Sequence, residues 1–260
     1  MSADDAAFLA ALPGSAFAFV AVLARVSAAV MAMPGFGQAD LPMTVRAGLA
    51  LVLTLLLLPL LAPLLPPEPA SVAAVAALLA GELVAGIWLG WLARLLTLAL
   101  PLAGQIIALM TGLSSVMIAD PDIGGQGPGL SRLFDLLVPV VIFGFGLHAE
   151  LLAALVGSYH LIPPGTWFPG GDSARTILAG VAESFALSLR LAAPFVLAGT
   201  LWPVGLALFG RLVPRIQIYF VAMPAQILGG IILLAVLLRM VIAAWIGALG
   251  PGFVQLPGFG

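Results

Sequence analysis

The sequence predicts an all-α membrane protein, because its composition, its long apolar runs and its few charges do not fit a water-soluble domain. Of the 260 residues, 63% are hydrophobic and 8% are charged, and the mean hydropathy is +1.23. A soluble domain carries roughly a quarter charged residues. A chain without water around it must be helical or form a closed barrel, and the continuous apolar runs lack the alternation of barrel strands. We therefore expect about six long apolar helices in one membrane domain over residues 1–260.

Proline and glycine, rather than charges, mark the ends of the expected helices. The six apolar segments lie at about residues 15–33, 45–65, 71–110, 133–156, 177–210 and 218–249. Proline kinks or breaks helices, and the later segments contain Pro101, Pro194, Pro203 and Pro224. Segment 71–110 is too long for a simple span of about 20 residues. It is therefore expected either to kink at Pro101 or to extend beyond the bilayer.

The arginines between the segments predict the orientation in the membrane. The first, third and fifth loops contain Arg46, Arg132, Arg211 and Arg215, whereas the other loops and both tails contain only Arg175. Basic residues favour the cytoplasmic side. The odd loops are therefore expected in the cytoplasm and both termini outside.

The residues that are missing exclude several kinds of chemistry. The chain has no cysteine and two histidines, and all nine of its basic residues are arginine. Disulfides, thiolate metal sites and lysine-dependent phosphate binding are therefore excluded. The net charge of −2 gives no electrostatic footprint for nucleic acid. No spacing typical of a nucleophile with its base is present, so we expect a non-enzymatic protein without a cofactor.

Residues 112–130 are rich in glycine and proline but also contain the apolar residues Val116, Met117 and Ile118. Helix is costly here, at about 1 kcal/mol per glycine and about 3 kcal/mol per proline relative to alanine. One interpretation is an ordinary connecting loop. The other is a movable seal in a pore, because irregular backbone at membrane depth is tolerated where it lines a cavity.

Charged side chains inside the apolar segments should face a partner or a wet lumen, because each is costly in lipid. They are Arg25, Glu82, Arg94, Glu150, Glu183, Arg190 and Arg239. Structural bridges between helices, pore-lining charges and an ion relay are the three interpretations. Gly81, Gly86 and Gly90 recur at helical spacing and permit close helix packing.

Four stretches, in chain order, resemble the FliR family of flagellar export-gate proteins, whose injectisome relatives are called SctT. The first is RVSAAVMAMPGFG at 25–37 with LPMTVRAGLALVLT at 41–54, and the second is GLSSVMIADP at 112–121 with LSRLFD at 130–135. The third is His148 with LIPPG at 161–165. The fourth is LFGRLVPRIQ at 208–217 with FVAMPAQILG at 220–229. Together the matches span nearly the whole chain.

The resemblance implies a FliP-like N-terminal part and a FliQ-like helical hairpin at about 177–250. It implies a subunit of the type III export gate in the bacterial inner membrane, within the flagellar basal body, that passes unfolded proteins. The implied partners are FliP-like and FliQ-like subunits in a hetero-oligomer, a FlhB-like subunit at the cytoplasmic entrance, and membrane lipid. Nucleic acid is not an implied partner.

The resemblance also assigns roles to residues. The segment at 112–130 matches the family's plug, and the plug residues carried over are Val116, Met117, Ile118, Asp120, Pro121, Gly124 and Gly125. The cytoplasmic entrance loop would contain Arg211, Arg215 and Gln217. Intersubunit or lumen-facing positions are implied for Arg25, Glu82, Arg94, Glu183, Arg190 and Arg239. The family often has aromatic residues in the plug, whereas this chain has Ser115 and Ile118.

A transporter of small solutes or ions in the inner membrane is the alternative. Its substrate site would use helices broken at proline, since discontinuous helices build midplane sites in transporters. A matched inverted repeat and a clustered pair of buried acids are both missing from the sequence, which weighs against this alternative.

Overall fold

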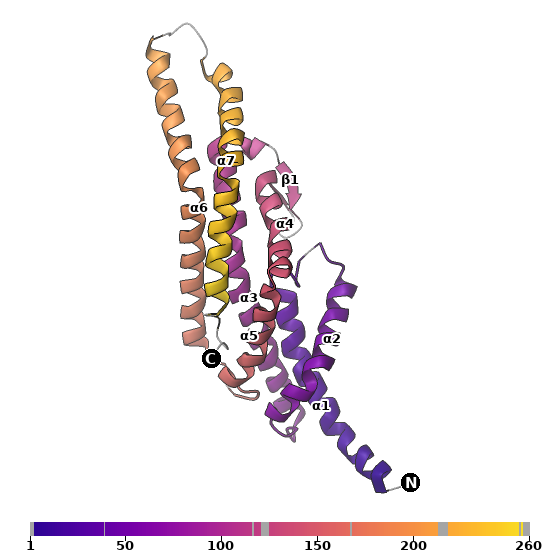
Figure 1. The fold of residues 1–260 in the computed structure, drawn as a ribbon. Coiled ribbons are helices and arrows are strands. Elements are labelled where there is room, and N and C mark those ends of the chain that lie inside the picture. Colours follow the sequence, from indigo (N-terminus) through magenta and orange to yellow (C-terminus); the bar gives the residue numbers. More distant parts are fainter. Residues whose placement is uncertain are drawn as a thin grey trace. The chain divides into compact units, whose positions relative to one another are not determined.

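The computed structural model describes residues 3–38, 40–115, 117–120, 125–166, 168–212, 218–254 and 256 (Figure 1). In these residues the helices are α1 (Ala3–Ala32), α2 (Met43–Leu61), α3 (Val72–Thr111), α4 (Gly129–Gly144), α5 (Leu147–Leu161), α6 (Gly170–Leu212) and α7 (Ile218–Val254). Two short 3-10 turns, η1 (Ala62–Leu64) and η2 (Leu113–Ser115), and two strands, β1 (Met117–Asp120) and β2 (Gly125–Pro128), complete the order.

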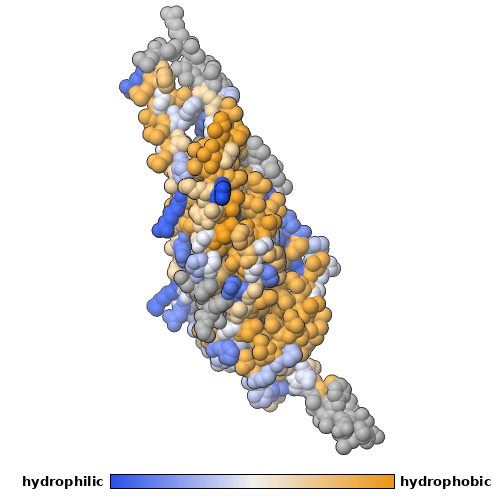
Figure 2. All heavy atoms as spheres, viewed as in Figure 1, coloured by the Kyte–Doolittle hydropathy of each residue, from blue (hydrophilic) through white to orange (hydrophobic). Residues whose placement is uncertain are grey.

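The predicted class of helical membrane protein is confirmed. Five helices within the described residues are long and apolar enough to cross a membrane, or six if the bent pair α4–α5 forms one span. Apolar residues, in orange, dominate the face seen in Figure 2, and the polar ones are scattered among them. Such a surface needs lipid or other protein around it, because contact between this much apolar area and water is unfavourable.

Proline lies inside the long helices and does not end them. Pro101 lies within the 40 residues of α3, and Pro194 and Pro203 lie within the 43 residues of α6. At 1.5 Å per residue, α3 is about 60 Å long, which is about twice the hydrocarbon thickness of a bilayer. Of the two possibilities for this segment, extension beyond the bilayer thickness therefore agrees with the helix length.

The expected helix at 133–156 is two helices rather than one, which corrects the prediction. Helix α4 ends at Gly144, α5 begins at Leu147, and the two axes are bent by 78°. Between them, Gly146 has a φ of 75°, a left-handed conformation that glycine adopts without strain and that ends helices. The sequence gives little sign of this break, because Phe145 continues the apolar run between the two helices.

The segment at 112–130 contains a β-hairpin, where the sequence predicted a loop. Strands β1 and β2 are antiparallel, with Met117 opposite Pro128 and Asp120 opposite Gly125. The pairing gives backbone groups hydrogen-bond partners that a loop away from water would lack. One end of the hairpin follows α3 through η2, and the other end leads directly into α4.

The chain divides into two compact units. Unit 1 consists of residues 1–94, 142–178 and 252–260, and unit 2 consists of residues 95–141 and 179–251. In unit 1, α1 packs against α2, and the buried side chains include Val22, Val26, Met33, Leu89 and Leu155. In unit 2 the buried side chains include Leu100, Ile107, Phe134, Phe195 and Trp245.

Two glycines of α3 allow α1 to approach closely in unit 1. A Cβ at Gly86 would overlap the carbonyl oxygen of Arg25, and a Cβ at Gly90 would lie 2.5 Å from the Ala32 Cβ. The predicted role of these glycines in helix packing is therefore confirmed. The same prediction is wrong for Gly81, because a Cβ at that position would meet nothing within 4 Å.

This difference gives a matched pair of substitutions. We expect Gly86→Ala to destabilise the protein by about 1–3 kcal/mol, the usual cost of overpacking a core. Gly81→Ala should be neutral or stabilising, since alanine is favoured over glycine in a helix by up to about 1 kcal/mol. Thermal unfolding of the detergent-solubilised variants measures the difference. Equal melting temperatures for the two would contradict this account of the α1–α3 contact.

Candidate functional site

A buried ion pair joins α1 and α3 in unit 1. Arg25 Nε donates to Glu82 Oε2 at 2.7 Å, and Nη2 donates to Oε1 at 3.0 Å. The two side chains are 1% and 2% exposed. This two-point geometry is the strong form of an arginine–carboxylate contact.

The remaining contacts of Arg25 are at the C-terminal end of α5. Nη1 donates to the carbonyl oxygen of Ser158 at 3.1 Å, and Nη2 donates to that of Ile162 at 2.9 Å. The guanidinium carbon lies 4.0 Å from the centre of the Tyr159 ring. The last carbonyls of a helix lack intrahelical partners and carry partial negative charge, so a cation is favourable there. One side chain therefore ties together three helices.

The position of this pair corrects the interpretation of Arg25 and Glu82 as intersubunit or lumen-facing charges. Both are buried within unit 1 and bonded to each other, so the interpretation as a structural bridge between helices holds for them. A buried pair repays the cost of its desolvation only when the geometry is good and the remaining donors are satisfied. Each nitrogen of this guanidinium donates at least one hydrogen bond.

The other charged residues of the apolar helices lie in different surroundings. Glu183 and Arg190 on α6 and Arg239 on α7 are exposed, and none of them forms an ion pair with a described residue. Arg94 on α3 is half-buried. Three exposed charges on helices with this many apolar residues are costly in lipid, so a role against another chain or a wet lumen stays a prediction for them.

The residues predicted to form the plug lie in or beside the hairpin of unit 2. Met117, Ile118 and Asp120 belong to β1, and Gly125 begins β2. Val116, Pro121 and Gly124 lie outside the described residues, as do Arg215 and Gln217 of the predicted entrance loop, while Arg211 is exposed in the last turn of α6.

The helices on either side of the hairpin pack closely together within unit 2. Ser131 Oγ in α4 donates to the carbonyl oxygen of Pro101 in α3 at 3.0 Å. A Cβ at Gly104 would lie 2.9 Å from the Phe134 ring, so only glycine allows α4 this close to α3. The segment between Thr111 and Gly129 therefore connects two helices that pack directly against each other.

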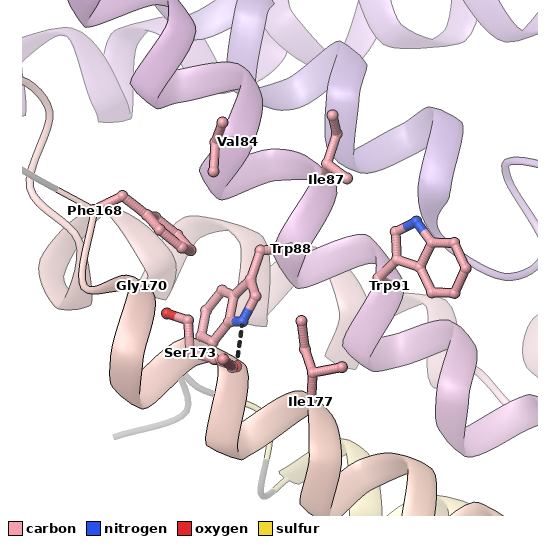
Figure 3. Close-up of a pocket in the computed structure, with 9 residues that line it drawn as sticks. Val84, Ile87, Trp88, Trp91, Phe168, Gly170, Ser173 and Ile177 are labelled. Atoms are coloured by element: carbon pink, nitrogen blue, oxygen red, sulfur yellow. Dashed lines mark hydrogen bonds between the residues drawn. The ribbon is translucent and has the colours of Figure 1, made fainter.

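An apolar groove of about 420 Å³ lies in unit 1 between α3 and the start of α6 (Figure 3). Trp88 lies between Phe168 and Ser173, and its indole nitrogen donates to the carbonyl oxygen of Ser173 at 3.3 Å. Trp91, Val84 and Ile177 line the rest of the groove. The lining has no titratable side chain, so the groove suits apolar contact rather than chemistry. Sequence analysis missed it because the two halves lie about 80 residues apart.

A helical membrane protein with a hairpin between packed helices is the class that this geometry defines. The sequence model of the family described as Bacterial export proteins, family 1, matches residues 16–250. The chain belongs to this family, and the resemblance to FliR proteins is confirmed.

Three curated relatives illustrate the similarity. Flagellar biosynthetic protein FliR of Caulobacter vibrioides is 33% identical over 224 residues, which cover 86% of this chain and 89% of the relative. Flagellar biosynthetic protein FliR of Escherichia coli is 28% identical, with 84% and 83% covered. Yop proteins translocation protein T of Yersinia pestis is 26% identical over 151 residues, with 57% and 58% covered.

The buried pair can be tested by removing one partner or both. Arg25→Met leaves the Glu82 carboxylate buried without its partner, which should cost about 3–5 kcal/mol of stability. The double variant Arg25→Met, Glu82→Leu removes both charges and should recover most of that loss. With the single variant Glu82→Leu and the original chain, thermal unfolding of the four proteins in detergent gives the coupling free energy. Additive losses would show that the two side chains do not depend on each other.

Proposed function

We propose that this chain is a non-enzymatic subunit of a flagellar type III protein-export gate. In this proposal residues 1–260 act as one membrane domain in the bacterial inner membrane, within the basal body. The chain forms part of the channel entrance for unfolded flagellar proteins, together with FliP-like and FliQ-like subunits. Membership of the bacterial export family and the curated flagellar relatives support this assignment.

The hairpin at residues 117–128 is the observation that carries the proposal. It connects two tightly packed helices, α3 and α4, in a chain with few charges. Pairing of β1 with β2 gives partners to the backbone groups that face each other, whereas the outward-facing groups of both strands need water or other protein. Non-helical backbone of this kind is tolerated at membrane depth where it lines a water-filled cavity, so a glycine-rich hairpin suits the lumen of a pore. We assign it as the plug of the gate.

The outer faces of α6 and α7 support the proposal of partner subunits. Only 17% of the most apolar part of α6 and 11% of that of α7 is buried within the chain. Large exposed side chains on these faces include Phe185, Leu197, Leu201, Phe209, Leu228, Ile232 and Val236. The exposed Glu183, Arg190 and Arg239 lie on the same two helices and would be satisfied by a neighbouring chain. FliQ-like hairpins suit this surface, and a FlhB-like subunit would meet the loop after Arg211.

The flagellar system is favoured over an injectisome by the extent of similarity. The flagellar relatives from Caulobacter and Escherichia match over more than four fifths of the chain, and the Yersinia translocation protein over 57%.

Shortening the hairpin tests the plug. Because Met117 and Pro128 are paired, two glycines can replace residues 118–127 while α3 and α4 remain connected. We expect the complex to assemble and the membrane to leak small ions or solutes. A membrane-potential dye measures this leak in cells that express the full gate, with the intact chain as control. Normal permeability of an assembled complex would contradict the assignment of the plug.

Purification in mild detergent tests the partners and the alternative function. We expect the tagged chain to bring down several copies of two smaller helical membrane proteins, identified by mass spectrometry. A transporter would instead purify as a monomer or dimer whose thermal stability rises with a particular solute. That second result would overturn the export-gate assignment.

A further inference from the structure

The C-terminal end of α3, immediately before the hairpin, is held by α6 and α7 within unit 2. We propose that Gln226, Gly199 and Gly230 form a plug clamp, in which they hold Met110 and Thr111 and so fix the base of the plug. The proposal rests on the assignment of the hairpin as the plug and adds the residues that position it. Figure 1 shows α6 and α7 running alongside α3, as the residue contacts require.

Gln226 supplies the polar contact of the plug clamp. Its Nε2 atom, on α7, donates to the carbonyl oxygen of Met110 at 3.2 Å. Since α3 ends at Thr111, this carbonyl is one of the last four of the helix, which lack partners within the helix. In an apolar environment an unpaired carbonyl is costly, so the amide of Gln226 stabilises the end of α3 where it is.

The two glycines let α6 and α7 approach the same two residues of α3. A Cβ at Gly199 would lie 2.8 Å from the Met110 Cβ and 2.9 Å from its carbonyl oxygen. A Cβ at Gly230 would overlap the Cβ of Thr111, which is 4% exposed. Any larger residue at either position must push its helix away from the end of α3.

The plug clamp ends where the chain turns toward the hairpin. Gly112 follows Thr111 with a φ of 77°, a left-handed conformation that redirects the backbone out of α3. Beyond it lie η2 and β1. The plug clamp therefore contacts the last two residues of α3, and the chain changes direction at Gly112 immediately after them.

A cavity of about 270 Å³ lies beside the plug clamp. It is lined by Met110, Thr111, Gly199, Gln226 and Gly230, and also by Phe195, Ala198, Trp202, Ala225, Gly229 and Leu233. Gln226 itself lines this space, so its side chain has room to move away from the Met110 carbonyl. Because the outer faces of α6 and α7 are exposed, a neighbouring subunit that shifts these helices would loosen the base of the plug.

Adjacent glycines of α7 provide a matched test. Gly230→Ala places a methyl group against Thr111, whereas a Cβ at Gly229 meets nothing within 4 Å. In gates assembled to the same amount, we expect Gly230→Ala to increase ion leak several-fold and Gly229→Ala to leave it unchanged. The membrane-potential assay used for the hairpin replacement measures both. Equal leak for the two alanine variants, with a leaking hairpin replacement, would overturn the plug clamp and leave the plug assignment intact.

A second variant covers the case in which Gly230→Ala fails to assemble. Gln226→Leu removes the donor to Met110 and keeps a side chain of similar size, and Gln105→Leu removes an exposed amide of α3 as the control. We expect leak from the first and none from the second. Equal behaviour of this pair would overturn the proposal.

The plug clamp can also be measured separately from the plug. The chain has no cysteine, so Thr111→Cys introduces a single, buried thiol. Its reaction with a maleimide should be several-fold faster in the Gln226→Leu background than in the Gln105→Leu background. This result would support the contact of Gln226 with the end of α3 even if the hairpin replacement did not leak and the plug assignment fell. Equal rates would overturn it.

Discussion

Backbone hydrogen bonding away from water is the constraint on which the rest of this structure depends. Most of a chain with this composition lies away from water, so each backbone donor and acceptor there needs a hydrogen-bond partner in the protein. Long helices meet that need along most of the chain, and β1–β2 pairing meets part of it where glycine and proline disfavour helix. Helix ends remain the difficult places. Arg25 donates to the carbonyls at the end of α5, and Gln226 donates to one at the end of α3.

The charged residues divide into two groups with different physical roles. In unit 1, Arg25 and Glu82 neutralise each other inside the protein and join helices that are far apart in the sequence. In unit 2, Glu183, Arg190 and Arg239 are exposed on apolar helices. The first arrangement is complete within one chain, whereas the second is stable only with water or another chain nearby. The exposed charges of α6 and α7 therefore fit the proposed association with neighbouring subunits.

The class of fold and the positions of most helices could be predicted from the sequence, because apolar length is a local property. The break at Gly146 could not, since Phe145 keeps the run apolar and the signal is one glycine conformation. The hairpin was missed because glycine and proline argue against helix without favouring a strand. The pairing of Arg25 with Glu82 spans 57 positions, and only the tertiary packing brings them together. The packing of Gly86 and Gly90 was predictable from helical spacing, but spacing did not separate them from Gly81.

The proposed plug closes at rest and opens for export, and such a device needs contacts that differ between the two states. A ligand or partner shifts an equilibrium only through such a difference. The pairing of β1 with β2 lies within the hairpin and offers no such difference. The end of α3 does offer one. Its contact with Gln226 depends on where α7 lies, and the outer face of α7 is exposed. In the proposed gate, coupling between partner subunits and the plug would pass most directly through Met110 and Thr111. A shift of α7 there changes both a hydrogen bond and the packing next to a cavity.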